Sequence, residues 1–106
     1  MARPVIWTEA ARTDLDEVAE YVARADPGEA GRIVAEALRR ADDRAMFPES
    51  GSIVPEANEP QMREVIVKRS FRLIYELSPG QITIIAFIRA RRKLTKKSLA
   101  ARHPSK

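Results

Sequence analysis

The sequence contains no cysteine, which excludes disulfides, thiolate metal ligands and a cysteine nucleophile. It has only four glycines, and it lacks a glycine-rich phosphate loop, a nucleophile elbow and any metal-ligand spacing. The longest apolar run, Ile84 to Ile88, is far shorter than the roughly 20 residues that span a bilayer, and the N-terminus lacks the apolar stretch of a signal peptide. We therefore expect a cytoplasmic protein that needs no cofactor or metal and does not enter a membrane.

The size and composition of the chain predict one small domain. It has 106 residues, of which 44% are apolar and 32% are charged, and this is not the composition of a disordered segment. A chain of this length buries only about two-thirds of its unfolded surface, so there is little room for a deep cofactor pocket. We expect residues 1–93 to form the domain. Residues 94–106 are expected to form a basic tail, which has too few apolar residues to require a packed helix.

Charge is distributed unevenly along the chain. Residues 89–106 contain eight of the 19 Lys and Arg residues and no acid, whereas residues 1–88 contain 11 basic and 15 acidic residues. This polarity predicts that the C-terminal end meets an anionic partner, either nucleic acid or an acidic protein segment. A solvated basic end without a ligand is the alternative.

Two amphipathic helices are predicted in the first half of the chain. Thr8 is a good N-cap, and apolar residues recur every three or four positions from Ala11 to Ala25. Asp26 can cap a second helix with Pro27 at its first position, and the apolar stripe of that helix runs from Ala30 to Ala45. The two helices should form an antiparallel hairpin.

The second half predicts a small antiparallel sheet. Residues 47–60 have no period and are typical of a loop, and three segments rich in β-branched and aromatic residues follow at 63–68, 71–77 and 82–89. The short links between them suit hairpin turns. With a first strand at residues 3–7, the predicted order is β-α-α-β-β-β, an α+β fold in which the helix hairpin covers one face of the sheet.

Alternation along the strands predicts which face each residue occupies. We expect the helix side to carry Val65, Val67, Leu73, Tyr75, Leu77, Ile82, Ile84, Ala86 and Ile88. We expect the opposite, exposed face to carry Glu64, Arg72, Glu76 and Arg89. Tyr75 and Trp7 are therefore predicted to be core residues. Arg63 could pair with Glu64 or Glu76 across the sheet.

Short sequence pieces at the junctions of these elements add a family resemblance. They are Trp7-Thr8-Glu9-Ala10, the helix text from Asp14 to Val22, Phe47-Pro48 with Gly51, Arg63-Glu64-Val65, Phe71 to Tyr75, and Ile88 to Arg92. In this order and spacing, over residues 4–93, the chain resembles the ParE/RelE superfamily of toxins from type II toxin–antitoxin systems, also called the plasmid stabilisation family.

The resemblance implies one of two activities, because RelE-like toxins cut messenger RNA on the ribosome whereas ParE-like toxins poison DNA gyrase. If the chain is a ribonuclease, its catalytic candidates are Arg63, Arg72 and Arg89, which would hold the scissile phosphate. Such chemistry also needs a proton acceptor. RelE-like members place a Tyr where this chain has Thr95, and its only histidine, His103, lies near the end.

The ParE-like alternative fits the last strand better, since those toxins often end in a basic Arg-Arg sequence, although many carry His at the position of Arg89. The residues predicted to bind the target or nucleic acid are Arg72, Arg89, Arg91, Arg92 and Lys93. In this reading the chain inhibits gyrase by binding, breaks no bond itself and is not an enzyme.

The resemblance also implies a small acidic antitoxin, ParD-like or RelB-like, whose disordered C-terminal segment folds across the toxin. Operator DNA would then be bound only through the antitoxin. A basic patch beside apolar grooves would steer and seat such a segment, and we expect the first strand or the exposed edge of the sheet to take part. A third possibility is a non-toxic antitoxin- or DNA-binding module with the same fold.

Overall fold

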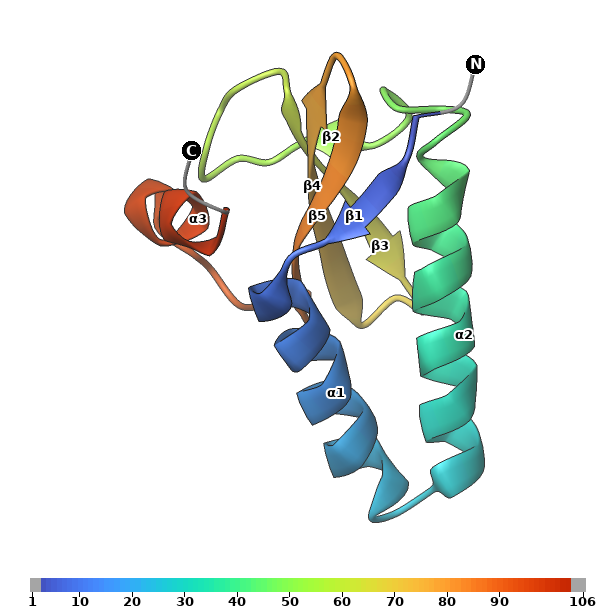
Figure 1. The fold of residues 1–106 in the computed structure, drawn as a ribbon. Coiled ribbons are helices and arrows are strands. Elements are labelled where there is room, and N and C mark those ends of the chain that lie inside the picture. The colour runs from blue at the N-terminus through green and yellow to red at the C-terminus, as the bar shows by residue number, and fades with distance from the viewer. Residues whose placement is uncertain (1–2, 104–106) are drawn as a thin grey trace.

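The computed structural model, which describes residues 3–103, has a five-stranded sheet with helices on both faces (Figure 1). Its elements are β1 (Val5–Trp7), α1 (Glu9–Ala23), α2 (Pro27–Asp43), β2 (Ser52–Ile53), β3 (Met62–Val67), β4 (Phe71–Ser78), β5 (Gln81–Arg89) and α3 (Lys96–Arg102). The α+β prediction is confirmed. Two short elements, β2 and α3, are present in addition to the predicted ones.

The helix hairpin begins where the capping residues predict. The Thr8 hydroxyl accepts a hydrogen bond from the Ala11 N–H at 3.0 Å, and the Asp26 carboxylate accepts one from the Glu29 N–H at 3.0 Å. Of the predicted stripe of α2, Ala30, Ile33, Ala37 and Ala41 are buried, but Leu38 is 44% exposed. The small side chains let α1 and α2 lie close together over the sheet.

The strand order is β1-β5-β4-β3-β2. The pairing of β1 with β5 is parallel and the other pairings are antiparallel, so the last three long strands form the predicted meander. Strand β2 lies within the predicted loop and pairs with Arg63 and Glu64 of β3. A strand of two residues is too short to show alternation, and the sequence therefore contains no signal for it.

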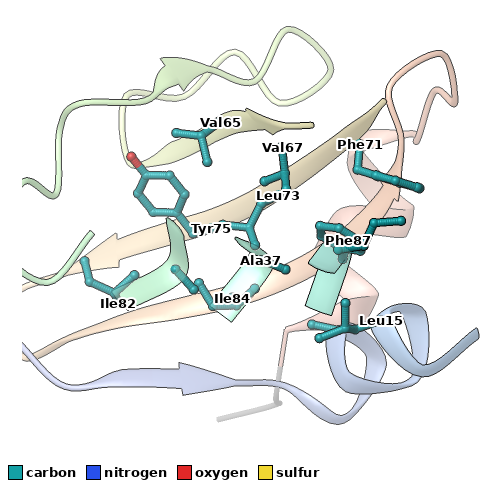
Figure 2. Close-up of a cluster of buried hydrophobic side chains, with 13 residues drawn as sticks. Leu15, Ala37, Val65, Val67, Phe71, Leu73, Tyr75, Ile82, Ile84 and Phe87 are labelled. Carbon is teal, nitrogen blue, oxygen red and sulfur yellow. The ribbon is translucent and has the colours of Figure 1, made fainter. Parts of the chain in front are cut away.

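The core between the helices and the sheet is the one that alternation predicts for β3 and β4. Figure 2 shows Leu15 of α1 and Ala37 of α2 beside the strand residues Leu73 and Phe87. Tyr75 is fully buried, and its hydroxyl donates to the Pro48 carbonyl at 2.8 Å and accepts from the Gly51 N–H at 3.0 Å. Its predicted core role is confirmed, and Trp7 packs against the same cluster while partly buried.

A β-bulge in β5 reverses the predicted faces of its second half. Tyr75 pairs with Ile84 and Ile74 with Ala86, so Ile85 is an extra residue without a partner. Beyond it, Ala86 and Ile88 lie in the core on the other face of the sheet, whereas Phe87 joins the helix-side core. The prediction that Ala86 and Ile88 face the helices is wrong. Side chains of a strand alternate between the two faces of the sheet, so one inserted residue moves every later side chain to the opposite face.

The face expected to be exposed carries a second core. Its buried residues are Val54, Ala57, Met62, Ile74, Ile85, Ala86, Ile88, Leu94 and Leu99. Leu94 and Leu99 fasten the end of the chain there, and α3, capped by the Thr95 hydroxyl, lies across the sheet from α2 (Figure 1). Residues 94–103 are therefore packed rather than loose, and residues 104–106 of the predicted tail lie outside the described residues. No helix within residues 3–103 is long and apolar enough to cross a membrane.

Candidate functional site

Arg72 is buried between the sheet and the second layer, with a relative exposure of 4%. Its guanidinium donates to both carboxylate oxygens of Glu56, at 2.7 and 2.8 Å, and to Glu64 at 2.6 Å. The expectation that Arg72 is an exposed cation is wrong, because the loop before β3 and the chain after β5 cover this face. A single basic residue in a strand looks solvated until the acids that enclose it are known.

This buried cluster also anchors the chain that follows β5. Arg72 donates to the backbone carbonyl of Arg92 at 2.7 Å, and Glu56 accepts from the Leu94 N–H at 3.1 Å. Hydrogen bonds from the Arg72 side chain and from the Leu94 N–H lower the pKa of the Glu56 carboxyl to about 2, and Glu56 in turn raises the pKa of Arg72. The backbone carbonyl of Arg92 is therefore fixed by the buried Arg72, while the Arg92 side chain remains exposed.

Arg63 donates to backbone carbonyls of the loop before β3. It donates to the carbonyl of Pro60 at 2.8 Å and to those of Glu49 and Gly51 at 3.2 and 3.1 Å. The alternative in which Arg63 pairs with an acid of the sheet does not hold. Glu64 is bound by Arg72, and the Glu76 carboxylate contacts the His103 imidazole.

Arg89 ends β5 on the helix side of the sheet, which corrects the predicted face. It pairs with Phe71, so the two share a face and Arg72 points to the other one. Its guanidinium lies 5.6 Å from the ring centroids of both Tyr21 and Phe71, within cation–π range. Of the three ribonuclease candidates, only Arg89 is exposed. Arg72 is buried and Arg63 is partly buried, and the three do not converge on one point.

The basic segment, defined as Arg89 to Lys93, borders a pocket of about 550 Å³ between α1 and the end of β5. Tyr21, which is 61% exposed, lies on the α1 wall, and Phe87 lies on the wall formed by β5. Asp14 closes one side of the pocket. Its carboxylate accepts from the Phe87 N–H at 3.0 Å beside the bulge and also contacts the Arg102 guanidinium.

The cations of the basic segment are not neutralised within the protein. Among residues 3–103, no ion pair involves Arg89, Arg91, Arg92 or Lys93, and all are exposed. Elsewhere, exposed arginines such as Arg39 of α2 pair with acids of their own helix. The predicted binding residues other than Arg72 therefore form one group of available donors.

Sequence reasoning missed one cation at this end of the sheet. Arg69, in the turn between β3 and β4, borders a second pocket of about 460 Å³ together with Ser70, Arg89, Ala90 and Arg91. The Ala90 N–H donates to the Ser70 carbonyl at 2.8 Å, which places the turn beside the basic segment. The position of Arg69 could have been predicted from the sequence. Antiparallel pairing of the three predicted strands places the turn between the first two beside the end of the third.

A family model described as the ParE toxin of the type II toxin–antitoxin system parDE matches residues 5–94. The chain belongs to this family. A solved structure described as the chromosomal ParDE toxin–antitoxin system from P. aeruginosa has the same fold, with a TM-score of 0.70 and 20% sequence identity. That match covers 83% of this chain and 96% of the other. A comparison with curated proteins found no match.

Membership of the ParE toxin family confirms the resemblance seen in the sequence and its ParE-like side. The site in this ParE-family chain combines an exposed aromatic ring, an apolar wall and arginines that lack internal partners. Tyrosine and arginine are, with tryptophan, enriched among the residues that contribute most to binding at protein interfaces. The arrangement is suited to binding.

Proposed function

We propose that this chain is a type II toxin that inhibits DNA gyrase by binding it through the basic segment and Tyr21. The observation that carries the proposal is the group of four exposed cations, Arg89, Arg91, Arg92 and Lys93, that have no ion pair among residues 3–103 and lie beside an exposed ring. Guanidinium groups without internal partners keep their donors for carboxylates or phosphates of a target.

The same geometry argues against a ribonuclease. Arg63 and Arg72 are committed to contacts inside the protein, and the acids Glu64 and Glu76 each contact another side chain. General acid–base catalysis needs a proton acceptor within hydrogen-bond reach of the substrate, beside the groups that hold the phosphate. A binding toxin needs only a pre-positioned surface, and the anchoring of Arg92 through Arg72 supplies one.

We further propose that a small acidic ParD-like antitoxin neutralises the toxin in the cytoplasm, and that operator DNA is bound only through that antitoxin. The sheet has two open edges, β1 and β2, each with an exposed isoleucine, Ile6 at 43% and Ile53 at 41%. An added strand could pair with either edge while its acidic side chains meet the basic segment. Hydrogen exchange of the complex tests this, since full exchange at both edges would contradict it.

Induction of the chain without antitoxin in growing bacteria tests the target. Labelled thymidine incorporation should fall before labelled methionine incorporation, and the purified protein should inhibit supercoiling by gyrase. The double variant Arg91→Gln/Arg92→Gln should lose at least about tenfold in inhibition, equivalent to about 1.4 kcal/mol. Arg39→Gln on α2 is the matched control, because it removes an exposed arginine that already has acidic partners.

Two outcomes would overturn the gyrase proposal. Protein synthesis that stops first, with messenger RNA cleavage on ribosomes, would favour the ribonuclease. Normal growth at full expression of the folded chain would favour the non-toxic module.

A further inference from the structure

We propose that Arg69, Arg89 and Arg91 form a binding site for a phosphodiester group of the DNA backbone. The inference deepens the proposed function and rests on it for the identity of the DNA, which would be the segment that gyrase holds. The site shares Arg89 and Arg91 with the pocket beside Tyr21, but it opens toward Arg69 of the β3–β4 turn, a residue that the sequence pattern does not mark.

The lining of this second pocket is cationic and contains no carboxylate. Three arginines, the hydroxyl-bearing Ser70 and the small Ala90 surround a space of about 460 Å³. The neighbouring pocket beside Tyr21 instead includes the acids Asp14 and Glu17 and an apolar wall. A protein segment needs apolar contact to bind well, whereas a phosphate needs only donors and positive charge, so the two pockets favour different ligands.

The turn that supplies Arg69 has a backbone conformation that its residues rarely adopt. Lys68 and Arg69 have positive φ angles of 50° and 62°, and they are the two central residues of the turn closed by the hydrogen bond from the Ser70 N–H to the Val67 carbonyl. Positive φ at both central positions normally selects Asn or Gly. Strain of this kind persists most often where a side chain is used. Lys68 lies 3.6 Å from Glu29 of α2, whereas Arg69 makes no ion pair with any residue from 3 to 103. In this turn, Lys68 is therefore paired with an acid of the protein, whereas Arg69 can pair with a ligand.

The Arg89 side chain and the backbone beside Arg91 are held in place before a ligand arrives. The Arg89 guanidinium lies over the Tyr21 and Phe71 rings, at 5.6 Å from each centroid. Arg91 directly precedes Arg92, whose carbonyl accepts from the buried Arg72 at 2.7 Å. Since the backbone on both sides of the pocket is fixed, little conformational entropy is lost when a phosphate binds.

The test measures binding of a fluorescent duplex of arbitrary sequence by anisotropy, from about 50 to 200 mM salt. Each phosphate contact contributes about 0.9 to the slope of log K against log salt, so Arg69→Gln and Arg91→Gln should each lower its magnitude by about one. Arg39→Gln should leave the slope unchanged. Arg69→Gly is the decisive variant, because glycine relieves the positive φ, so we expect DNA binding to fall while the stability of the fold is kept or raised.

Supercoiling assays of the same variants separate this inference from the proposed function. Duplex binding that Arg69→Gly leaves unchanged, together with gyrase inhibition by the unaltered chain, would overturn the phosphate site and leave the gyrase proposal standing. A reduced slope without gyrase inhibition would support the site and overturn the gyrase proposal. A loss of affinity for gyrase that is equal with and without DNA would identify an acidic protein surface as the ligand and overturn the inference.

Discussion

The arginines on the two faces of the sheet differ in what they bind. Arg72, on the face beneath α3, directs its Nε and both terminal guanidinium nitrogens at acids or carbonyls of this chain. Arg89, on the face beneath α1, lies over two aromatic rings and has no ion pair among residues 3–103. The two positions are close in the register, since Arg89 pairs with the neighbour of Arg72. Residue type alone therefore does not determine the role of an arginine here. Glu56 and Glu64 pair with Arg72, whereas Asp14, the acid beside the end of β5, is bound by Arg102 and the Phe87 N–H.

Removal of Arg72 should have the largest effect on stability. Arg72→Met leaves Glu56 and Glu64 as uncompensated charges in a closed layer, and we expect a loss of about 3–5 kcal/mol in the free energy of unfolding. Urea denaturation followed by circular dichroism measures it. Arg91→Met is the matched exposed change and should stay within about 0.5 kcal/mol. Equal losses in the two variants would remove the distinction between the two faces.

Glu56→Gln should have a smaller effect, about 1–3 kcal/mol, because the amide keeps an acceptor but loses the charge that Arg72 faces. The pKa of Glu56 is lowered in the folded state from 4.5 to about 2, so its contribution is complete above pH 4.5 and is lost as pH falls toward 2. Unfolding titrations between these pH values should show a steeper loss for the unaltered chain than for the variant. Parallel curves would mean that Glu56 does not hold the cluster.

Tyr21→Ala should affect target binding and leave folding intact. The ring is 61% exposed, so its removal should change stability by less than about 0.5 kcal/mol. We expect the concentration needed for half inhibition of gyrase to rise about tenfold or more, equivalent to about 1.4 kcal/mol. Tyr21→Phe retains the ring under Arg89 and should remain near the unaltered value. An inactive Tyr21→Phe would assign the effect to the hydroxyl.

The smallest expected change is a gain in stability. Arg69→Gly relieves a positive φ of 62° and should stabilise the fold by about 1 kcal/mol, as measured by thermal denaturation. Arg39→Gly places glycine inside a helix and should instead destabilise it by about 1 kcal/mol. Destabilisation by Arg69→Gly would show that the Arg69 side chain supports the turn.

Local signals in the sequence were sufficient for most of the fold. The hydroxyl of Thr8 and the carboxylate of Asp26 cap the helices as predicted, and Tyr75 is buried as alternation requires. The bulge was not predictable, because residues 82–88 are all buried. Where both faces of a strand are buried, apolar and polar residues do not alternate, so one inserted residue leaves no signal in the sequence. The second core depends on Leu94 and Leu99, and two residues do not define a period.

The candidate site was predictable in part for the same reason. The basic character of Arg89 to Lys93 is local and visible in the sequence, and the structure brings these residues together with Tyr21. The burial of Arg72 depends on Glu56, which lies 16 positions away in a segment without regular structure. Pairing between such distant charges cannot be predicted from sequence spacing. For this reason Arg72 was predicted to be an exposed binding residue, although it is a buried structural one.

The extra residue at Ile85 also has a geometric consequence for the end of the chain. It changes the parity of β5, so that Arg89 leaves the sheet toward α1 and its aromatic ring instead of toward α3. The Phe87 N–H, two residues after the inserted Ile85, donates a hydrogen bond to the Asp14 carboxylate of α1. This bond fixes α1 to the part of β5 in which the faces are exchanged. A chain with one residue fewer in this strand would present the same arginine to the opposite layer, with no other change in composition.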